Sequence, residues 1–88
     1  MIFHDTDRLR FEQDEDGRLV YASYRFRNGA YALTHVEADE ELRGTGAAGR
    51  FMQALVQHAR DNSLKLAPMC SYARSWSKRH PEANDVLS

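Results

Sequence analysis

The chain has 88 residues, a formal net charge of −1 and 42% hydrophobic residues, a composition typical of one small domain, which we expect to span residues 1–88. Twelve basic residues are balanced by thirteen acidic ones without a basic run, so no nucleic-acid partner is expected. The single cysteine and the lack of a long apolar segment predict a cytoplasmic protein with no membrane partner. Four scattered histidines predict no metal site. So small a core would gain from association, so we expect a monomer or a homodimer.

Two turn signals divide the first half of the chain. Asp16-Gly17 and Asn28-Gly29 each lie between runs rich in aromatic and β-branched residues, which predicts two-residue hairpin loops and a three-stranded antiparallel meander. Strict alternation from these loops then assigns each side chain to a face. The face expected to be buried carries Leu9, Phe11, Val20, Ala22, Tyr24, Phe26, Tyr31 and Leu33, with Gln13, His35 and Glu37 toward one end.

The second half predicts a crossover and a closing helix. Residues 46–62 carry apolar side chains at helical spacing, which would cover the buried face of the sheet. Residues 64–69 follow so closely that they predict the second strand of a β-α-β crossover, parallel to the third strand. Residues 72–80 predict a short helix that Pro81 ends. The predicted order is β-β-β-α-β-α, an α+β fold with one α/β crossover. The apolar stripe of the long helix comprises Ala48, Phe51, Met52, Leu55 and Ala59.

A glycine-rich segment precedes the long helix. Gly44, Gly46 and Gly49 fit the G-x-G-x-x-G pattern of dinucleotide-binding folds, but a single crossover and a following strand without a terminal acidic residue exclude that fold. Glycines at a helix start leave backbone N–H groups that can hold a phosphate or diphosphate. The alternative is that they only make a tight connection from strand to helix.

Several motifs carry a family resemblance. Arg43-Gly-Thr-Gly-Ala-Ala resembles the R-x-x-G-x-A signature of the GNAT acetyltransferase superfamily. Together with Thr34-His-Val-Glu, Glu41-Leu-Arg-Gly, Leu66-Ala-Pro-Met-Cys-Ser-Tyr and Arg79-His-Pro-Glu, it makes residues 9–86 similar to the small, single-domain YjdJ-type branch. The chain differs from ordinary GNAT enzymes in lacking the expected first strand and the helices that usually build the acceptor pocket.

The resemblance implies a minimal GNAT fold that binds acetyl-CoA, with the diphosphate of coenzyme A on the glycine loop and the pantetheine arm between the third and fourth strands. Arg50, Lys78 and Arg79 are further candidate phosphate contacts. The cofactor-binding residues that the resemblance implies are Val36, Leu42, Arg43, Gly44, Thr45, Gly46, Ala47 and Ala48.

Four side chains are candidates for acetyl transfer. Cys70 follows the fourth strand and is either a nucleophile that accepts the acetyl group or a small buried packing residue. His35 and Glu37, two residues apart, are candidate bases for the incoming amine, or a structural histidine and a solvated carboxylate. The resemblance implies that Tyr72 protonates the leaving sulfur, although Tyr72 could simply pack the closing helix.

We therefore expect an acetyl-CoA-dependent N-acetyltransferase that acts on a small-molecule or peptide amine, directly or through Cys70. The alternative is a non-catalytic acyl-CoA-binding or protein-interaction module, since the usual acceptor helices are missing.

Overall fold

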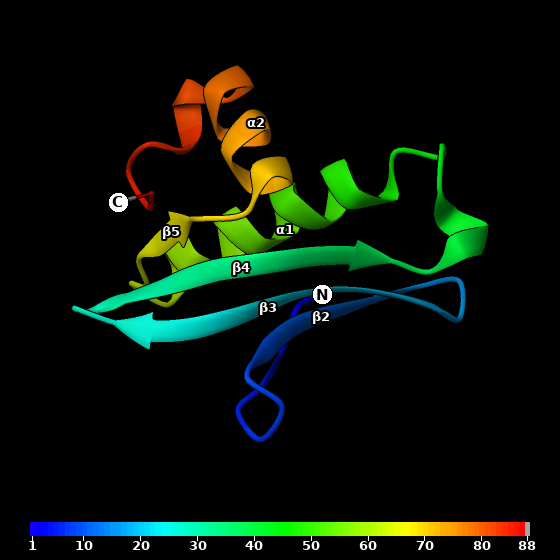
Figure 1. The fold of residues 1–88 in the computed structure, drawn as a ribbon, viewed down its shortest axis with the longest axis horizontal. Helices are drawn as coiled ribbons and strands as arrows, with labels where there is room; N and C mark the ends of the chain where they lie inside the picture. Colours follow the sequence, from blue (N-terminus) through cyan, green and yellow to red (C-terminus); the bar gives the residue numbers. More distant parts are fainter. Residues whose placement is uncertain (88) are drawn as a thin grey trace.

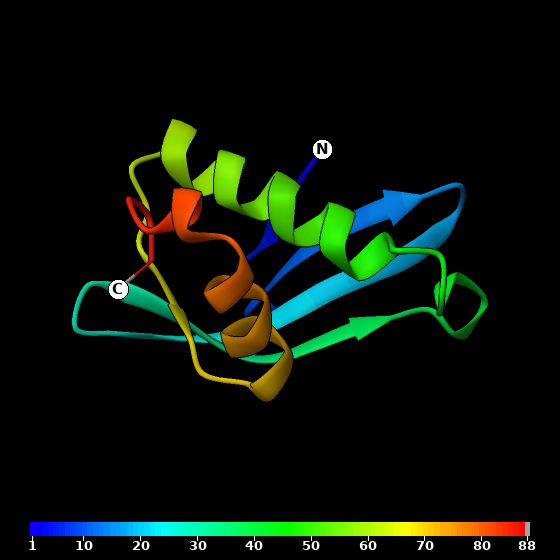
Figure 2. The same cartoon turned by 90° about the horizontal axis from the view of Figure 1, so that it is seen from above.

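Five strands form one mixed sheet, and both helices lie against the same face of it (Figure 1, Figure 2). The structure is a computed structural model that describes residues 1–87. Neighbouring strands are antiparallel except β4 and β5, which are parallel. Short 3-10 helices lie at Glu40–Leu42 and Pro81–Ala83. In chain order the elements are β1 (Phe3–Asp5), β2 (Arg10–Glu15), β3 (Arg18–Arg27), β4 (Ala30–Ala38), α1 (Ala47–Asp61), β5 (Leu66–Pro68) and α2 (Ser71–Arg79).

The predicted α+β architecture is confirmed, with one addition at the start of the chain. Strand β1 pairs with β2, with Phe3 opposite Glu12 and Asp5 opposite Arg10. The expectation that the first strand is missing was therefore wrong. Three residues are too few for an alternating pattern to stand out in a sequence.

Both hairpin turns have the predicted geometry. Glu15 pairs with Arg18 across the first turn, and Arg27 pairs with Ala30 across the second. The loop residues Asp16-Gly17 and Asn28-Gly29 all have positive φ, between 53° and 80°. This is the type I′ conformation that Asp-Gly and Asn-Gly favour, and its twist matches that of the strands.

A β-bulge in β4 changes which side chains face the helices. Leu33 pairs with Tyr24 and His35 pairs with Ser23, so Thr34 is an extra residue in the ladder. Its hydroxyl donates a hydrogen bond to the Ser23 carbonyl at 3.3 Å. Beyond the bulge, the alternation is shifted by one residue.

His35 and Glu37 consequently lie on the outer face, which no helix within residues 1–87 covers. Val36 and Ala38 instead pack against the core beneath α1. The prediction that His35 and Glu37 face the helix was wrong, because it assumed regular alternation through residue 34.

Two apolar residues of the predicted buried face are exposed. Leu9 belongs to the turn between β1 and β2, with a left-handed φ of 56° and 51% of its surface exposed. Phe26 lies at the far end of β3, where its ring packs at a tilt against Tyr31 but stays 58% exposed.

The core lies between the sheet and the two helices. Ala73 and Trp76 of α2 are buried in the same cluster as α1. Ala48 was predicted in the helix stripe but is only partly buried, and Ala47 takes its place. None of the helices within residues 1–87 is long and apolar enough to cross a membrane. The buried residues of α1 are Ala47, Phe51, Met52, Leu55, Val56 and Ala59, and they pack on Phe11, Val20, Ala22, Tyr24 and Leu33 of the sheet.

The parallel pairing of β4 with β5 is short. It runs from Tyr31 opposite Leu66 to Leu33 opposite Pro68, and then the amides of Met69 and Cys70 both donate to the Leu33 carbonyl, at 3.1 and 3.0 Å. The chain next turns into α2, whereas β4 continues to Ala38. The two strands therefore part at Leu33, as the predicted pantetheine cleft requires.

Candidate functional site

The glycine loop enters α1 through two left-handed residues. Gly44 has φ of 80° and Gly46 has φ of 84°, a region that side chains disfavour. Gly46 is the N-cap of the 15-residue helix and supplies no side-chain acceptor. The first-turn amides of α1 therefore have no side-chain cap from Gly46, and the positive end of the helix dipole is available to an anion.

A cavity of about 320 Å³ lies beside this loop. Its wall is formed by the end of β4, the loop, the first turn of α1 and the start of α2. Two of the expected cofactor-binding residues, Val36 and Thr45, do not line it. The lining residues are Ala38, Leu42, Arg43, Gly44, Gly46, Ala47, Ala48, Gly49 and Tyr72.

Val36 lies on β4 close to this cavity, at the edge that β5 leaves. The Asp39 amide donates to the Leu19 carbonyl of the β3 side at 2.9 Å. In an antiparallel strand, the backbone N–H and C=O groups of successive residues point alternately to the two sides. Because those of Asp39 point toward β3, those of Ala38 and Val36 point away from it. Within residues 1–87 no strand pairs with this part of β4 on that side. The edge thus offers peptide groups to an amide-bearing ligand.

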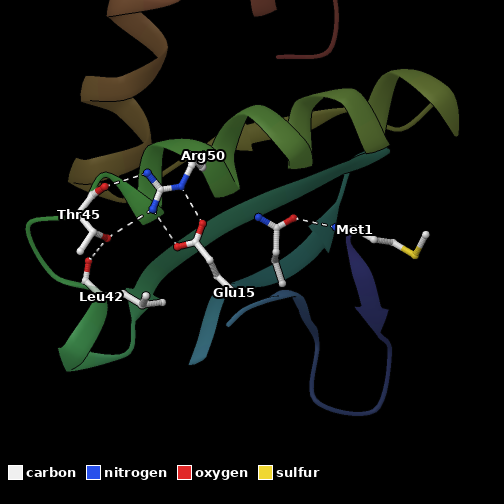
Figure 3. Close-up of polar contacts among 6 residues, drawn as sticks. Met1, Glu15, Leu42, Thr45 and Arg50 are labelled. Atoms are coloured by element: carbon white, nitrogen blue, oxygen red, sulfur yellow. Dashed lines mark hydrogen bonds and ion pairs between the residues drawn. The ribbon is translucent and has the colours of Figure 1, made fainter. Parts of the chain in front are cut away.

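Thr45 is turned toward the protein. Its hydroxyl donates to the Leu42 carbonyl at 2.5 Å, and its own carbonyl accepts from Nη1 of Arg50 at 2.8 Å (Figure 3). Arg50 also makes a two-pronged contact with Glu15, at 2.7 and 2.9 Å. This hydrogen bonding to Arg50 lowers the pKa of Glu15. Arg50, a candidate phosphate contact, therefore already has a carboxylate partner.

Arg43 belongs to a polar row on the outer side of the cleft. Its Nη2 donates to Oε2 of Glu37 at 3.1 Å, and Oε1 of Glu37 lies 2.9 Å from Nε2 of His35. Arg43 remains 65% exposed, so most of its donors are accessible to a ligand. The structure thus joins the two candidate bases to the candidate phosphate-binding arginine.

Cys70 lies two residues beyond β5, as expected, and it caps α2. Its Sγ accepts a hydrogen bond from the Ala73 amide at 3.4 Å, and its side chain is half-buried. The sulfur therefore has a structural role at a helix N-terminus, where negative charge is favoured.

Tyr72 reaches from α2 to the first turn of α1. Its hydroxyl would lie 3.9 Å from a Cβ placed on Gly49. Burial raises the pKa of Tyr72, and the nearby Arg79 opposes this only in part. The hydroxyl is consequently protonated at neutral pH and can donate a proton into the cavity.

No group of three or more metal-ligating side chains occurs within the described part of the chain.

The profile of the family described as GCN5-related N-acetyl-transferase matches residues 8–86. The chain belongs to this GNAT family. The NMR solution structure of a GCN5-like protein from Staphylococcus aureus resembles this GNAT domain with a TM-score of 0.70 and 30% sequence identity, over 100% of this chain and 87% of that chain. No curated protein gives a significant match. The expected family and fold are confirmed, while the individual site residues stay predictions.

Sequence analysis of this GNAT domain missed Glu15 altogether. Glu15 lies 35 residues from Arg50 in the chain, and no spacing rule links the end of a hairpin strand to the first turn of a helix.

Proposed function

We propose that this GNAT domain is an acetyl-CoA-dependent N-acetyltransferase whose acceptor is a small-molecule or peptide amine. The proposal depends on one arrangement: the glycine loop and the parting of β4 from β5 open into the same region. A diphosphate on the loop amides and an amide-bearing arm along Val36 and Ala38 would then belong to one extended ligand. Coenzyme A has both parts.

The residues present suit each part of that ligand. The Gly46, Ala47 and Ala48 backbone lines the cavity without large side chains, and the exposed guanidinium of Arg43 can reach a phosphate. The side chain of Leu42 adds an apolar surface to the wall of this cavity. The Val36 amide, which points to the parted edge, is a donor for the acyl carbonyl.

Acetyl-CoA supplies an activated acetyl thioester when it is bound. In direct transfer, the amine nitrogen attacks the acetyl carbon, the C–S bond breaks, and the paired side chains of His35 and Glu37 accept the proton that the amine loses. Tyr72 donates its proton to the departing sulfur and regains one from solvent.

A route through Cys70 would divide the transfer into two steps. The Cys70 thiolate would attack the acetyl carbon, and coenzyme A would leave as a thiolate that takes a proton from Tyr72. The amine nitrogen would then attack the acetyl carbon, lose its proton to the paired His35 and Glu37 side chains, and release Cys70 as the thiolate. The N-cap position supports this route, because the amides of α2 stabilise negative charge on Sγ before attack and after release.

The outer-face position of His35 and Glu37 supports approach of the acceptor from the side opposite α1. Coenzyme A would occupy the cavity beside the glycine loop, and the amine would reach the parted edge across the uncovered sheet face. The two substrates would thus meet without competing for the same space.

Calorimetry and thermal melting with coenzyme A test the proposal. Ligand at about 100 times Kd adds about 2.7 kcal/mol of stability, which raises the Tm of a domain this size by roughly 10 to 20 °C. Gly46→Glu should abolish the shift by placing a carboxylate where the diphosphate binds. Gly29→Glu is the matched control, since it adds the same charge at a similar positive φ in a distant turn.

A measurement of turnover distinguishes an N-acetyltransferase from a non-catalytic acyl-CoA-binding module. Release of free coenzyme A from acetyl-CoA should depend on an added amine, within a panel of polyamines, lysine peptides and arylamines. Tight binding with no amine-dependent release would favour a non-catalytic acyl-CoA-binding module. A Tm that coenzyme A leaves unchanged would overturn both.

A further inference from the structure

An ion pair ties the first turn of α1 to the end of β2. Nε and Nη2 of Arg50 donate to the two carboxylate oxygens of Glu15, at 2.7 and 2.9 Å (Figure 3). The Glu15 side chain is only 23% exposed. Such two-pronged contacts fix the plane of a guanidinium as well as its position. Glu15 itself is the last residue of β2 and pairs with Arg18 across the tight turn, so the hairpin fixes the position of its backbone.

A further donor of the guanidinium acts on the glycine loop. Nη1 of Arg50 donates to the Thr45 carbonyl at 2.8 Å. Because a trans peptide is planar, its carbonyl and the next N–H point in opposite directions. Because Arg50 holds the Thr45 carbonyl, the Gly46 amide points away from the Glu15–Arg50 ion pair. Within residues 1–87 that amide has no hydrogen-bond acceptor.

Close packing of Arg50 on the loop is visible at Gly46. A Cβ at this position would lie 3.2 Å from Nη1 of Arg50, and the φ of 84° already disfavours a side chain. Arg50 and the loop backbone therefore form one packed unit.

We propose that Glu15 and Arg50 are positioning residues for the diphosphate site: Glu15 orients Arg50, and Arg50 orients the Thr45–Gly46 peptide so that its amide can bind a phosphate oxygen. This inference rests on the proposed function. It differs from a direct role for Arg50, in which the guanidinium itself would bind phosphate.

The variant Glu15→Gln distinguishes the two roles by the sign of its effect. If Arg50 binds phosphate directly, loss of the competing carboxylate leaves affinity for coenzyme A unchanged or raises it. If Arg50 positions the loop, loss of its anchor weakens binding. Loss of one well-made hydrogen bond corresponds to about a tenfold change, so we expect Kd for coenzyme A to rise by roughly that factor.

A matched control exists at the other end of α1. Arg60 makes the same two-pronged contact with Asp85, at 2.6 and 2.8 Å, and also reaches a backbone carbonyl, that of Glu82. Asp85→Asn should lower Tm to an extent similar to Glu15→Gln but leave the Kd for coenzyme A unchanged. Pantetheine, which lacks the diphosphate, should bind the wild type and Glu15→Gln equally well.

Calorimetry on these five protein–ligand combinations, together with the Gly46 amide resonance in NMR spectra, completes the test. A Kd for coenzyme A that is unchanged or lower in Glu15→Gln would overturn the inference. If the wild-type protein does not bind coenzyme A, the proposed function fails. The NMR measurement still decides whether the Glu15–Arg50 pair fixes the conformation of the glycine loop. A Gly46 resonance that shifts in Glu15→Gln but not in Asp85→Asn is the expected result, and an unmoved resonance would refute it.

Discussion

Nε2 of His35 lies 2.9 Å from Oε1 of Glu37, while the other carboxylate oxygen of Glu37 accepts a hydrogen bond from Arg43. One carboxylate thus joins a candidate base to a candidate phosphate-binding residue. The two candidate bases are therefore predicted to differ when each is replaced. His35 contacts Glu37, whereas Glu37 contacts both His35 and Arg43.

We expect His35→Gln to lower kcat by about 10²-fold or more, which is the usual contribution of a general base, and to leave the Kd for coenzyme A unchanged. Glu37→Gln should lower kcat and also change that Kd, because Arg43 loses its partner. Steady-state rates and calorimetry on both variants give the comparison. An unchanged kcat in His35→Gln would show that the imidazole takes no proton from the amine.

Replacement of Cys70 separates its helix-capping role from its thiol chemistry. Ser is a preferred N-cap residue and sulfur is a weak acceptor, whereas Ala cannot accept the hydrogen bond that the Ala73 amide donates to Sγ. Cys70→Ser should therefore keep or raise Tm, and Cys70→Ala should lower it. Differential scanning calorimetry measures both.

The same pair of variants tests the two-step route. Incubation with acetyl-CoA should add one acetyl mass to the wild-type chain and none to Cys70→Ser, whose hydroxyl is a much weaker nucleophile. Full turnover in Cys70→Ser would instead establish direct transfer.

Tyr72→Phe should reduce kcat and leave affinity for coenzyme A within about twofold, since the ring still packs and only the proton donor is lost. Burial raises the pKa of Tyr72 above its usual value of about 10. The hydroxyl should consequently stay protonated at pH 9, and the wild-type rate should not fall between pH 7 and 9 through its ionisation. A kcat unaltered by the substitution would mean that water protonates the sulfur.

Stability should depend on pH through His4. Nε2 of His4 lies 2.7 Å from the Tyr24 hydroxyl, and burial, followed by the charge of His58, lowers the pKa of His4, whereas Asp5 acts in the opposite direction. The unfolded chain therefore binds this proton at a higher pH than the folded chain does. The stabilisation is complete above about pH 6.5, the usual value for His, and is lost as pH falls through the folded pKa.

Urea unfolding at pH 7.5 and 5.5 checks this. The wild type should lose more free energy of unfolding between these pH values than His4→Gln, which cannot take up the proton. An equal loss of unfolding free energy in the two proteins would show that His4 does not contribute to the pH dependence of stability.

Local rules predicted most of the fold. The two hairpins followed from Asp-Gly and Asn-Gly, because those dipeptides tolerate positive φ at both positions. The crossover followed from helical spacing and a short return to the sheet. These features depend on residues close together in sequence, where conformational preference and burial act in the same direction.

The features that escaped prediction depend on distant parts of the chain. The extra residue Thr34 is stabilised by a hydrogen bond to Ser23, eleven residues earlier, and nothing in the local pattern of β4 distinguishes a bulge from regular alternation. The pairing of Glu15 with Arg50 likewise exists only after α1 has packed on the sheet. The glycine loop and its position at the start of α1 were thus predictable from local sequence, while the facing of two side chains and the support of the loop required three-dimensional structure.

Thr34 has a consequence for chain length. Because it has no partner across the ladder, a protein shortened by this single residue could keep Leu33 beside Tyr24 and His35 beside Ser23. Such a deletant would regularise the strand and remove the additional bend and twist that a bulge introduces. Its melting temperature would then report how much the bulge changes the stability of the domain, and its affinity for coenzyme A would report how far the gap between β4 and β5 depends on one inserted threonine.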